Sequence, residues 1–205
     1  MSLLNSEEQS AIADAIGRAE LRTAGELVVA TVPKSDSYEK ERFIAALFWT
    51  FGMAVFANWL LPDLSTLYLV LLQVPLLLVS YGLAGLPFIL RPMAGGRCDA
   101  MARQRAMRMF AERGVHQTRD RSGLLIMLSE LEHQVVILGD AGIHEKVGDP
   151  GWQGYVERIV TGLKAGKAGE AVVGVLDDLG EILATHFPAR GDDTNELGNE
   201  VVVES

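Results

Sequence analysis

The segment from residue 43 to residue 90 constrains the fold most, because Asp63 is its only charged residue. Its first part, residues 43–61, would extend about 28 Å as an α-helix, and its second part, residues 67–90, is longer. The hydrocarbon core of a bilayer is about 30 Å thick. Neither part has the polar face of a helix in a soluble protein. We therefore expect a transmembrane helical hairpin here, rather than a hairpin buried in a soluble core.

Basic residues flank this hairpin on both sides and are missing from its turn. The flanking residues are Lys34, Lys40 and Arg42 before the first span, and Arg91, Arg97, Arg103, Arg105 and Arg108 after the second. Lys and Arg are enriched on the cytoplasmic side of membrane proteins. We therefore expect a two-span protein of the cytoplasmic (inner) membrane with both termini in the cytoplasm. The single Cys98 is typical of a reducing compartment.

The rest of the chain divides into two blocks, residues 1–42 and 91–187, which we expect to form one discontinuous cytoplasmic domain. Residues 188–205 are rich in acidic and small polar residues, and their composition predicts a disordered tail. The formal net charge of −9 excludes nucleic acid as a partner, because its phosphates would be repelled. The bilayer itself, a membrane protein or a second copy of the chain remain as partners.

The two blocks contain helical and strand patterns in an α/β order. Helical patterns begin at Ser6, which we expect to be the capping residue, and recur after the hairpin. They cover residues 6–23, 97–113, 152–163 and 168–187. Apolar runs predict strands at residues 26–32, 123–128 and 134–138. The five-residue connection between the last two predicts an antiparallel hairpin, and the first strand should be parallel to its neighbour. The sequence thus predicts a small central mixed sheet flanked by helices and interrupted by the membrane hairpin.

This order of elements, with the residues at its corners, resembles the TPM domain family. The matching pieces are RTAGELVVATV at residues 22–32, DRSGLLIMLSELEHQVVILGDAGI at 120–143 and GLKAGKAGEAVVGVLDDLGEIL at 162–183. The resemblance implies a compact α/β domain with a central sheet between helices. Family members include a thylakoid-lumen protein with acid phosphatase activity and a role in photosystem repair, and an auxiliary subunit of acetylcholine receptors. Some members bind calcium, so the resemblance also implies a phosphomonoester hydrolase or a calcium module as alternatives.

Asp140 is the first candidate for a metal ligand or a catalytic acid, because it follows a predicted buried strand directly. Glu145 and Asp149 are close enough in sequence to join it around calcium, which needs six or more oxygen ligands. The alternative is that Asp140 caps a turn and that Asp149 before Pro150 starts a helix. This alternative is the favoured interpretation. It leaves His144 and Glu145 as surface residues.

Asp120 is the second candidate, and it lies between Arg119 and Arg121. A phosphatase would need these arginines to hold a phosphate and Asp120 to act as nucleophile or metal ligand. The two arginines also neutralise charge where the family often has an acidic approach to the strand, which argues against calcium. Glu26 begins an apolar strand and needs a partner. We expect a structural ion pair between Glu26 and Arg121, with Arg119 as the alternative partner.

No zinc pattern, phosphate-binding loop, dinucleotide fingerprint or nucleophile elbow occurs in the sequence. The sequence therefore favours a membrane-anchored, non-catalytic domain that binds a membrane protein or another copy of itself. The metal-dependent phosphatase using Asp120 and Asp140, and the calcium-binding module, stay open as alternatives.

Overall fold

Strands β1 (Glu26–Val32) and β2 (Gly123–Ser129) form the centre of the structure. They pair in parallel from Glu26↔Gly123 to Val32↔Ser129, and every residue of both strands is buried. The computed structural model describes residues 3–63, 65–147, 149–190 and 197–204, without the side chains of residues 147–150. It contains two compact units, Met1–Ser35 with Asp99–Ser205, and Asp36–Cys98.

The sheet of the first unit has the order β3-β2-β1-β4 and is mixed, as the sequence predicts. Strand β3 (Gln134–Gly139) is antiparallel to β2, whereas the short β4 (Val202–Val203) is parallel to β1. Parallel strands with helices on both faces are buried on both sides. This explains why the central strands are continuous apolar runs without alternation.

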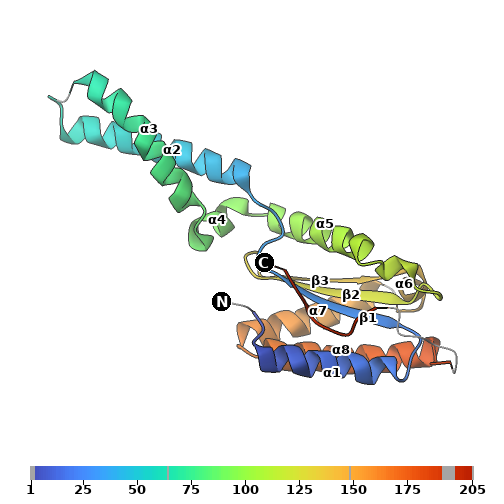
Figure 1. The fold of residues 1–205 in the computed structure, drawn as a ribbon. Coiled ribbons are helices and arrows are strands. Elements are labelled where there is room, and N and C mark those ends of the chain that lie inside the picture. Colours follow the sequence, from blue (N-terminus) through green and yellow to red (C-terminus); the bar gives the residue numbers. More distant parts are fainter. Residues whose placement is uncertain (1–2, 64, 148, 191–196, 205) are drawn as a thin grey trace. The chain divides into compact units, whose positions relative to one another are not determined.

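Helices cover both faces of this sheet (Figure 1). One face packs against α1 (Ser6–Glu20), α7 (Asp149–Lys164) and α8 (Ala168–His186). The other face packs against α5 (Arg97–Glu112) and the short 3₁₀ helix η1 (Val115–Gln117). Neighbouring residues of one strand serve opposite faces, so Val29 contributes to the first core and Val28 to the second. A short helix, α6 (Ala141–Val147), follows β3.

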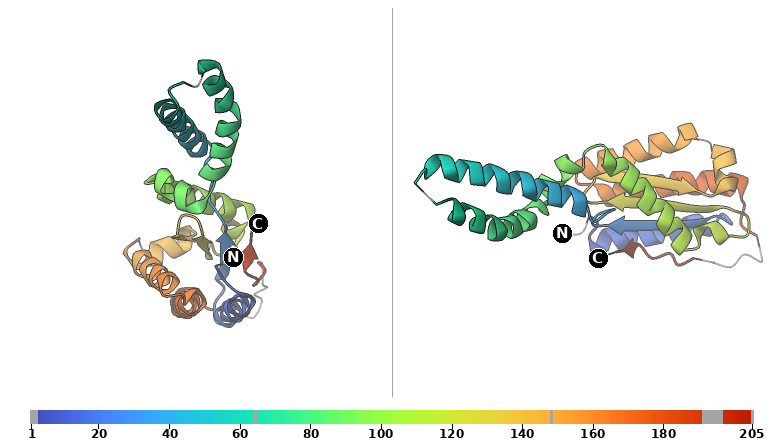
Figure 2. Two further views of the ribbon diagram at one scale, coloured as in Figure 1. Left: turned by 90° about the vertical axis from the view of Figure 1, so that its left-hand side faces the viewer. Right: turned by 90° about the horizontal axis from the view of Figure 1, so that it is seen from above.

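The second unit contains α2 (Glu39–Leu60), α3 (Thr66–Ala84) and α4 (Pro87–Ala94). By length and composition, α2 and α3 are each able to cross a membrane. They run side by side as a hairpin (Figure 2). The second helix ends at Ala84, earlier than the predicted residue 90. Gly85 is its C-cap, and Pro87 starts a separate helix because proline lacks the N–H that would continue the first.

The N-cap of helix α1 lies one residue before the predicted one. Asn5, not Ser6, is the N-cap: its side chain accepts a hydrogen bond from the Glu8 N–H at 2.8 Å. The Glu8 carboxylate accepts the Asn5 N–H at 2.8 Å in return. Both residue types favour this position. The carboxylate three residues after Asn5 decides between them, because it completes a reciprocal capping box.

The predicted disordered tail is wrong for the part of it that the structure describes. Val202 and Val203 pair with Ala30 and Thr31 of β1, and the Glu204 N–H donates to the Thr31 carbonyl at 3.0 Å. Acidic composition alone does not reveal such a strand, because its two valines gain stability only against β1. Residues 191–196 lie outside the described residues.

Gly123 at the start of β2 gives a test of this packing. A Cβ added there would lie 2.0 Å from the Val115 carbonyl oxygen, so Gly123→Ala must displace η1 or the strand. We expect a loss of about 3 kcal/mol in the free energy of unfolding, measured by denaturant titration. The matched control is Gly154→Ala in α7, where an added Cβ meets nothing within 4 Å. An equal effect of the two variants would contradict the predicted close packing.

Candidate functional site

The two predicted acidic residues lie at the same end of the sheet. Because β3 is antiparallel to β2, the end of β3 lies beside the start of β2: Gly139 pairs with Leu124, and the Asp140 N–H donates to the Gly123 carbonyl at 2.8 Å. A Cβ added at Gly142 would lie 3.0 Å from the carbonyl oxygens of both Asp120 and Arg121. The loop before β2 and the start of α6 are therefore packed together. The residues after β1 lie at the opposite end.

Asp140 has both carboxylate oxygens engaged. Its side chain is only 5% exposed, and Oδ2 accepts the Arg121 Nε–H at 2.7 Å. Oδ1 accepts the Ala141 N–H at 2.7 Å, and the Asp140 carbonyl accepts the N–H groups of Ile143 and His144. Asp140 thus starts α6, as the turn interpretation of the sequence predicts. A carboxylate whose two oxygens already accept hydrogen bonds from a guanidinium and a backbone N–H has little capacity left for a cation.

Asp120 is held by a different arginine. The Arg190 guanidinium lies 3.0 Å from Asp120 Oδ2 and 3.4 Å from Oδ1. Arg190 follows the end of α8, so this ion pair links the loop before β2 to the chain after the last helix. The side chains are 25% and 49% exposed, and such a partly exposed pair contributes about 1 kcal/mol or less.

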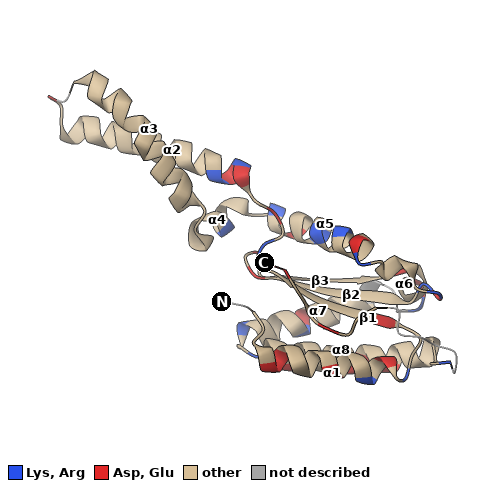
Figure 3. Ribbon diagram, viewed as in Figure 1, with Lys and Arg blue, Asp and Glu red and all other residues tan. Residues whose placement is uncertain are grey.

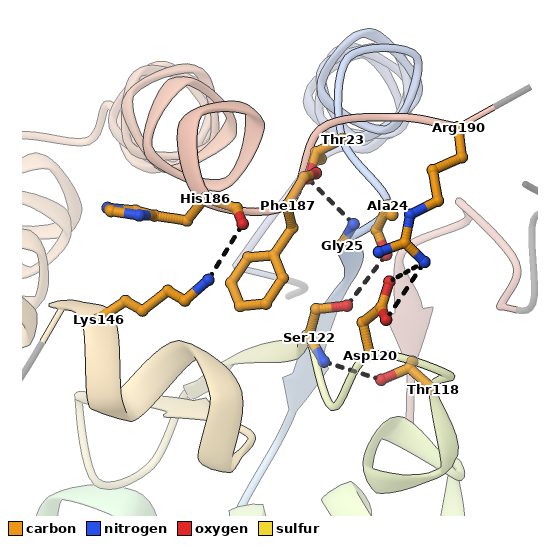
Figure 4. A network of polar contacts seen from close by, with 10 residues as sticks. All are labelled: Thr23, Ala24, Gly25, Thr118, Asp120, Ser122, Lys146, His186, Phe187 and Arg190. Atoms are coloured by element: carbon orange, nitrogen blue, oxygen red, sulfur yellow. Dashed lines mark hydrogen bonds and ion pairs between the residues drawn. The ribbon is translucent and has the colours of Figure 1, made fainter.

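A buried hydrogen-bond network lies behind these ion pairs (Figure 4). The Ser122 hydroxyl donates to the Ala24 carbonyl at 3.0 Å, and the Ser122 N–H donates to the Thr118 hydroxyl at 3.0 Å. The Thr23 hydroxyl donates to the Phe187 carbonyl at 2.6 Å and accepts the Gly25 N–H at 3.0 Å. The network joins the turn before β1, the loop before β2 and the end of α8. It rigidifies this end of the sheet.

The predicted Glu26–Arg121 contact is replaced by other contacts. Arg121 forms its ion pair with Asp140, whereas Glu26, 7% exposed, accepts the Leu197 N–H at 3.2 Å. Arg121 has a positive φ of 54°, a conformation that residues other than glycine rarely adopt. Arg121 thus combines this unusual backbone conformation with a side-chain ion pair to Asp140. Arg119 is exposed on the same loop.

The other predicted candidates, His144, Glu145 and Asp149, follow Asp140 in the sequence. His144 and Glu145 are exposed on α6, and the side chain of Asp149 lies outside the described residues. Among the described residues, no group of three or more His, Cys, Asp or Glu side chains is arranged to hold a metal ion. Asp140 and Asp120 therefore remain metal candidates by sequence, with arginines as their neighbours in the structure.

Sequence reasoning missed a buried polar cluster at the opposite end of the sheet. Glu132 is 2% exposed, its Oε1 accepts the Ser35 N–H at 2.8 Å, and its Oε2 accepts the Ser129 hydroxyl. The Ser35 and Ser129 hydroxyl oxygens lie 3.0 Å apart. From the sequence alone, Glu132 would be expected to be exposed to solvent, because it lies in the short connection between β2 and β3. It is buried here because the chain leaving β1 passes over the connection.

Two further acidic residues, Glu20 and Glu26, lie close to each other near the C-terminal segment. Burial raises the pKa of Glu20 to about 7, the Leu27 N–H that it accepts at 3.2 Å opposes the rise, and the nearby Glu26 carboxylate adds to it. Glu26 also binds the N–H of Leu197 in this segment. Glu26 thus contacts both the C-terminal segment and the neighbourhood of Glu20, whose pKa is raised to about 7.

Glu20 makes the stability depend on pH. Its pKa in the folded state exceeds the ordinary value of 4.5, so the stability present below pH 4.5 is progressively lost as the pH rises through 7. Glu20→Gln stays neutral and keeps an acceptor for Leu27. We expect it to be more stable than the wild type above pH 7 and similar to it near pH 4.5, in thermal denaturation.

The matched control is Asp14→Asn, an exposed position on the same helix. It should leave the pH dependence of the wild type unchanged. If Glu20→Gln keeps the wild-type slope between pH 4.5 and 7, Glu20 is not the titrating group.

Comparisons with known proteins agree with this fold. Residues 96–182, from α5 to α8, match the model of the TPM domain. The NMR structure of BA42 protein from the psychrophilic bacterium Bizionia argentinensis is similar, with a TM-score of 0.61 over 98% of this chain and 95% of that chain, at 23% sequence identity. Comparison with curated protein sequences finds no match. Residues 96–182 thus match the TPM domain, and the mixed sheet between helical layers agrees with the fold of the BA42 protein.

Proposed function

We propose that this protein is a membrane-anchored TPM protein whose α/β unit has a non-catalytic binding role. The observation that carries the anchor is the exposed apolar surface of α2 and α3. Phe48, Phe51 and Trp59 on α2 are 74%, 71% and 75% exposed, and Leu78 on α3 is 70% exposed. Contiguous apolar surface that extends along two exposed helices is rare on soluble monomers. A bilayer removes them from water.

The dimensions and the charges of the hairpin fit a bilayer. Helix α2 has 22 residues and α3 has 19, which correspond to about 33 Å and about 28 Å. Figure 3 shows that both helices are almost free of charged residues except near the start of α2. The turn between them carries Asp63 and no Lys or Arg, so the positive-inside rule supports cytoplasmic termini.

Arg42 supports a closed hairpin at its basic end. Its guanidinium carbon lies 4.5 Å from the centroid of the Tyr81 ring, and Nη2 donates to the Tyr81 carbonyl at 3.4 Å. A Cβ added at Gly85 would lie 2.9 Å from Nη2, so glycine makes room for the guanidinium. These contacts hold the start of α2 and the end of α3 together at the end of the hairpin that the positive-inside rule places in the cytoplasm.

The binding role, rather than catalysis, is supported by the state of the acidic residues. A nucleophile or a metal ligand needs an available carboxylate oxygen, whereas Asp140 and Asp120 each face an arginine. These residues tie loops together. The same arrangement speaks against the phosphatase and the calcium-binding alternatives.

Membrane anchoring predicts a labelling pattern in intact cells. In a Cys98→Ser background, Asp63→Cys should react with a membrane-impermeant maleimide, because the turn lies outside. Leu21→Cys, at a position that is 84% exposed at the end of α1, should react only after lysis.

Extraction of the membranes with alkaline carbonate is the control for anchoring. Both variants should remain in the pellet. Recovery in the supernatant would refute the anchor, and labelling of Leu21→Cys in intact cells would refute the orientation.

A non-catalytic role predicts no turnover of a phosphomonoester such as p-nitrophenyl phosphate by the full chain, with calcium, magnesium or manganese added. Asp140→Ala should instead lower the free energy of unfolding by about 2 kcal/mol, because Arg121 loses its partner and α6 its cap. Denaturant titration measures this loss.

Asp178→Ala is the control. Asp178 forms an ion pair with Arg158 in which both side chains are about half exposed, so the pair should contribute less than about 0.5 kcal/mol to the free energy of unfolding. Metal-dependent turnover that Asp140→Asn abolishes while the protein stays folded would overturn the non-catalytic role.

A further inference from the structure

We propose that the free edge of β3 binds an extended segment of a partner protein that presents acidic side chains to one face of the sheet and apolar side chains to the other. This inference deepens the proposed binding role and rests on it, but it does not depend on the membrane anchor. It concerns residues of the α/β unit alone.

The backbone of β3 has open hydrogen-bonding groups. In the order β3-β2-β1-β4, β3 is an outer strand. Asp140 bonds to Gly123, so the even-numbered residues of β3 face β2 in the antiparallel ladder. The N–H and C=O groups of Val135, Ile137 and Gly139 are therefore directed outward. An added strand supplies matching groups at this spacing.

A groove follows this edge over its whole length. All six residues of β3 line it, and its volume is about 430 Å³. Asp99, Ala102 and Arg103 of α5 line it from one face of the sheet, and Trp152, Gln153 and Val156 of α7 from the other. Because the helices rise on both sides of the strand, the space between them is suited to an extended chain.

This edge also lacks the usual protection against pairing. Outer strands of natural proteins are blunted by charged residues, proline or a bulge, whereas β3 has the sequence QVVILG and pairs with β2 in unbroken register. At the other edge of the sheet, β4 of the same chain is paired with β1.

The walls of the groove determine the chemistry of the occupant. Arg103 is exposed and has no acidic partner among the described residues, whereas Asp99 accepts the Gln134 Nε2–H at 2.6 Å. On the other side, Trp152 and Val156 of α7 are apolar, whereas Gln153 of α7 and His144 of α6 are polar. Successive side chains of an added strand point to opposite faces of the sheet. The preferred segment therefore presents an acidic residue to Arg103 and apolar residues to the α7 side.

The opposite edge of the sheet already binds such a segment. Val202 and Val203 pair with β1, and the Glu204 carboxylate forms an ion pair with Arg105 of α5. The same helix thus provides Arg105 to an apolar-acidic strand at one edge and Arg103 to the groove at the other. Residues 198–204, GNEVVVE, are accordingly a natural probe.

The experiment measures binding of a fluorescein-labelled peptide with the sequence GNEVVVE to the full chain in detergent micelles, by fluorescence anisotropy. We expect saturable binding that Arg103→Gln weakens about fivefold, the effect of one partly exposed ion pair. Arg108→Gln is the matched control, since Arg108 is exposed on the same helix and does not line the groove. It should bind as the wild type does.

A charge exchange tests the contact itself. The peptide GNKVVVK should bind Arg103→Glu more tightly than it binds the wild type. Circular dichroism should show the same fold for each variant.

Three outcomes would overturn the inference. The first is the absence of peptide binding. The second is peptide binding that Arg105→Gln weakens and Arg103→Gln does not, because this would indicate that the peptide displaces β4. The third is a dimer that forms without peptide and that Leu138→Lys dissociates, because this would indicate pairing of β3 with a second copy of the chain. Membrane extraction and the hydrolysis assay are unaffected by these outcomes, so a failure here leaves the proposed anchor and the non-catalytic role to their own tests.

Discussion

The parallel pairing of β1 with β2 is the constraint on which the rest of the structure depends. Seven residue pairs, from Glu26↔Gly123 to Val32↔Ser129, join two segments that are separated in sequence by the whole of α2 to α5. A parallel pair always needs a crossover connection. Here the connection between β1 and β2 contains the apolar hairpin. The sheet can therefore form only after the whole segment from α2 to α5 has been synthesised and β2 can pair with β1.

Polar contacts at both ends of the sheet hold this pairing in register. Glu132, with Ser129 and Ser35, lies where the chain leaves β1. Ser122 and Thr118 lie where it enters β2. Buried polar groups are costly unless each is paired, so these contacts favour a single arrangement over slipped alternatives. Asp120 and Asp140, the acidic residues that first suggest catalysis, form ion pairs with Arg190 and Arg121 at the same end of the sheet.

The sequence predicts those features of the fold that have a local cause. The hairpin, the two central strands and the mixed sheet follow from uninterrupted apolar runs and from the short β2–β3 connection. Contacts between distant residues have no such local cause. Nothing near Arg121 in sequence indicates that it pairs with Asp140, and the two valines of β4 look like part of an acidic tail until β1 lies beside them. The capping of α1 is an intermediate case, because the Asn5–Glu8 box is local but competes with Ser6.

The asymmetry between the two outer strands follows from the same physical rules. An unpaired strand edge exposes N–H and C=O groups that favour any extended chain, so each edge of a sheet must be covered or used. The chain covers the β1 edge with its own β4 and adds an Arg105–Glu204 ion pair. At β3 it supplies two helical walls and an arginine but no strand of its own among the described residues. Because the groove accommodates a strand and its walls carry complementary chemistry, this edge is better explained as a binding surface than as an unprotected boundary.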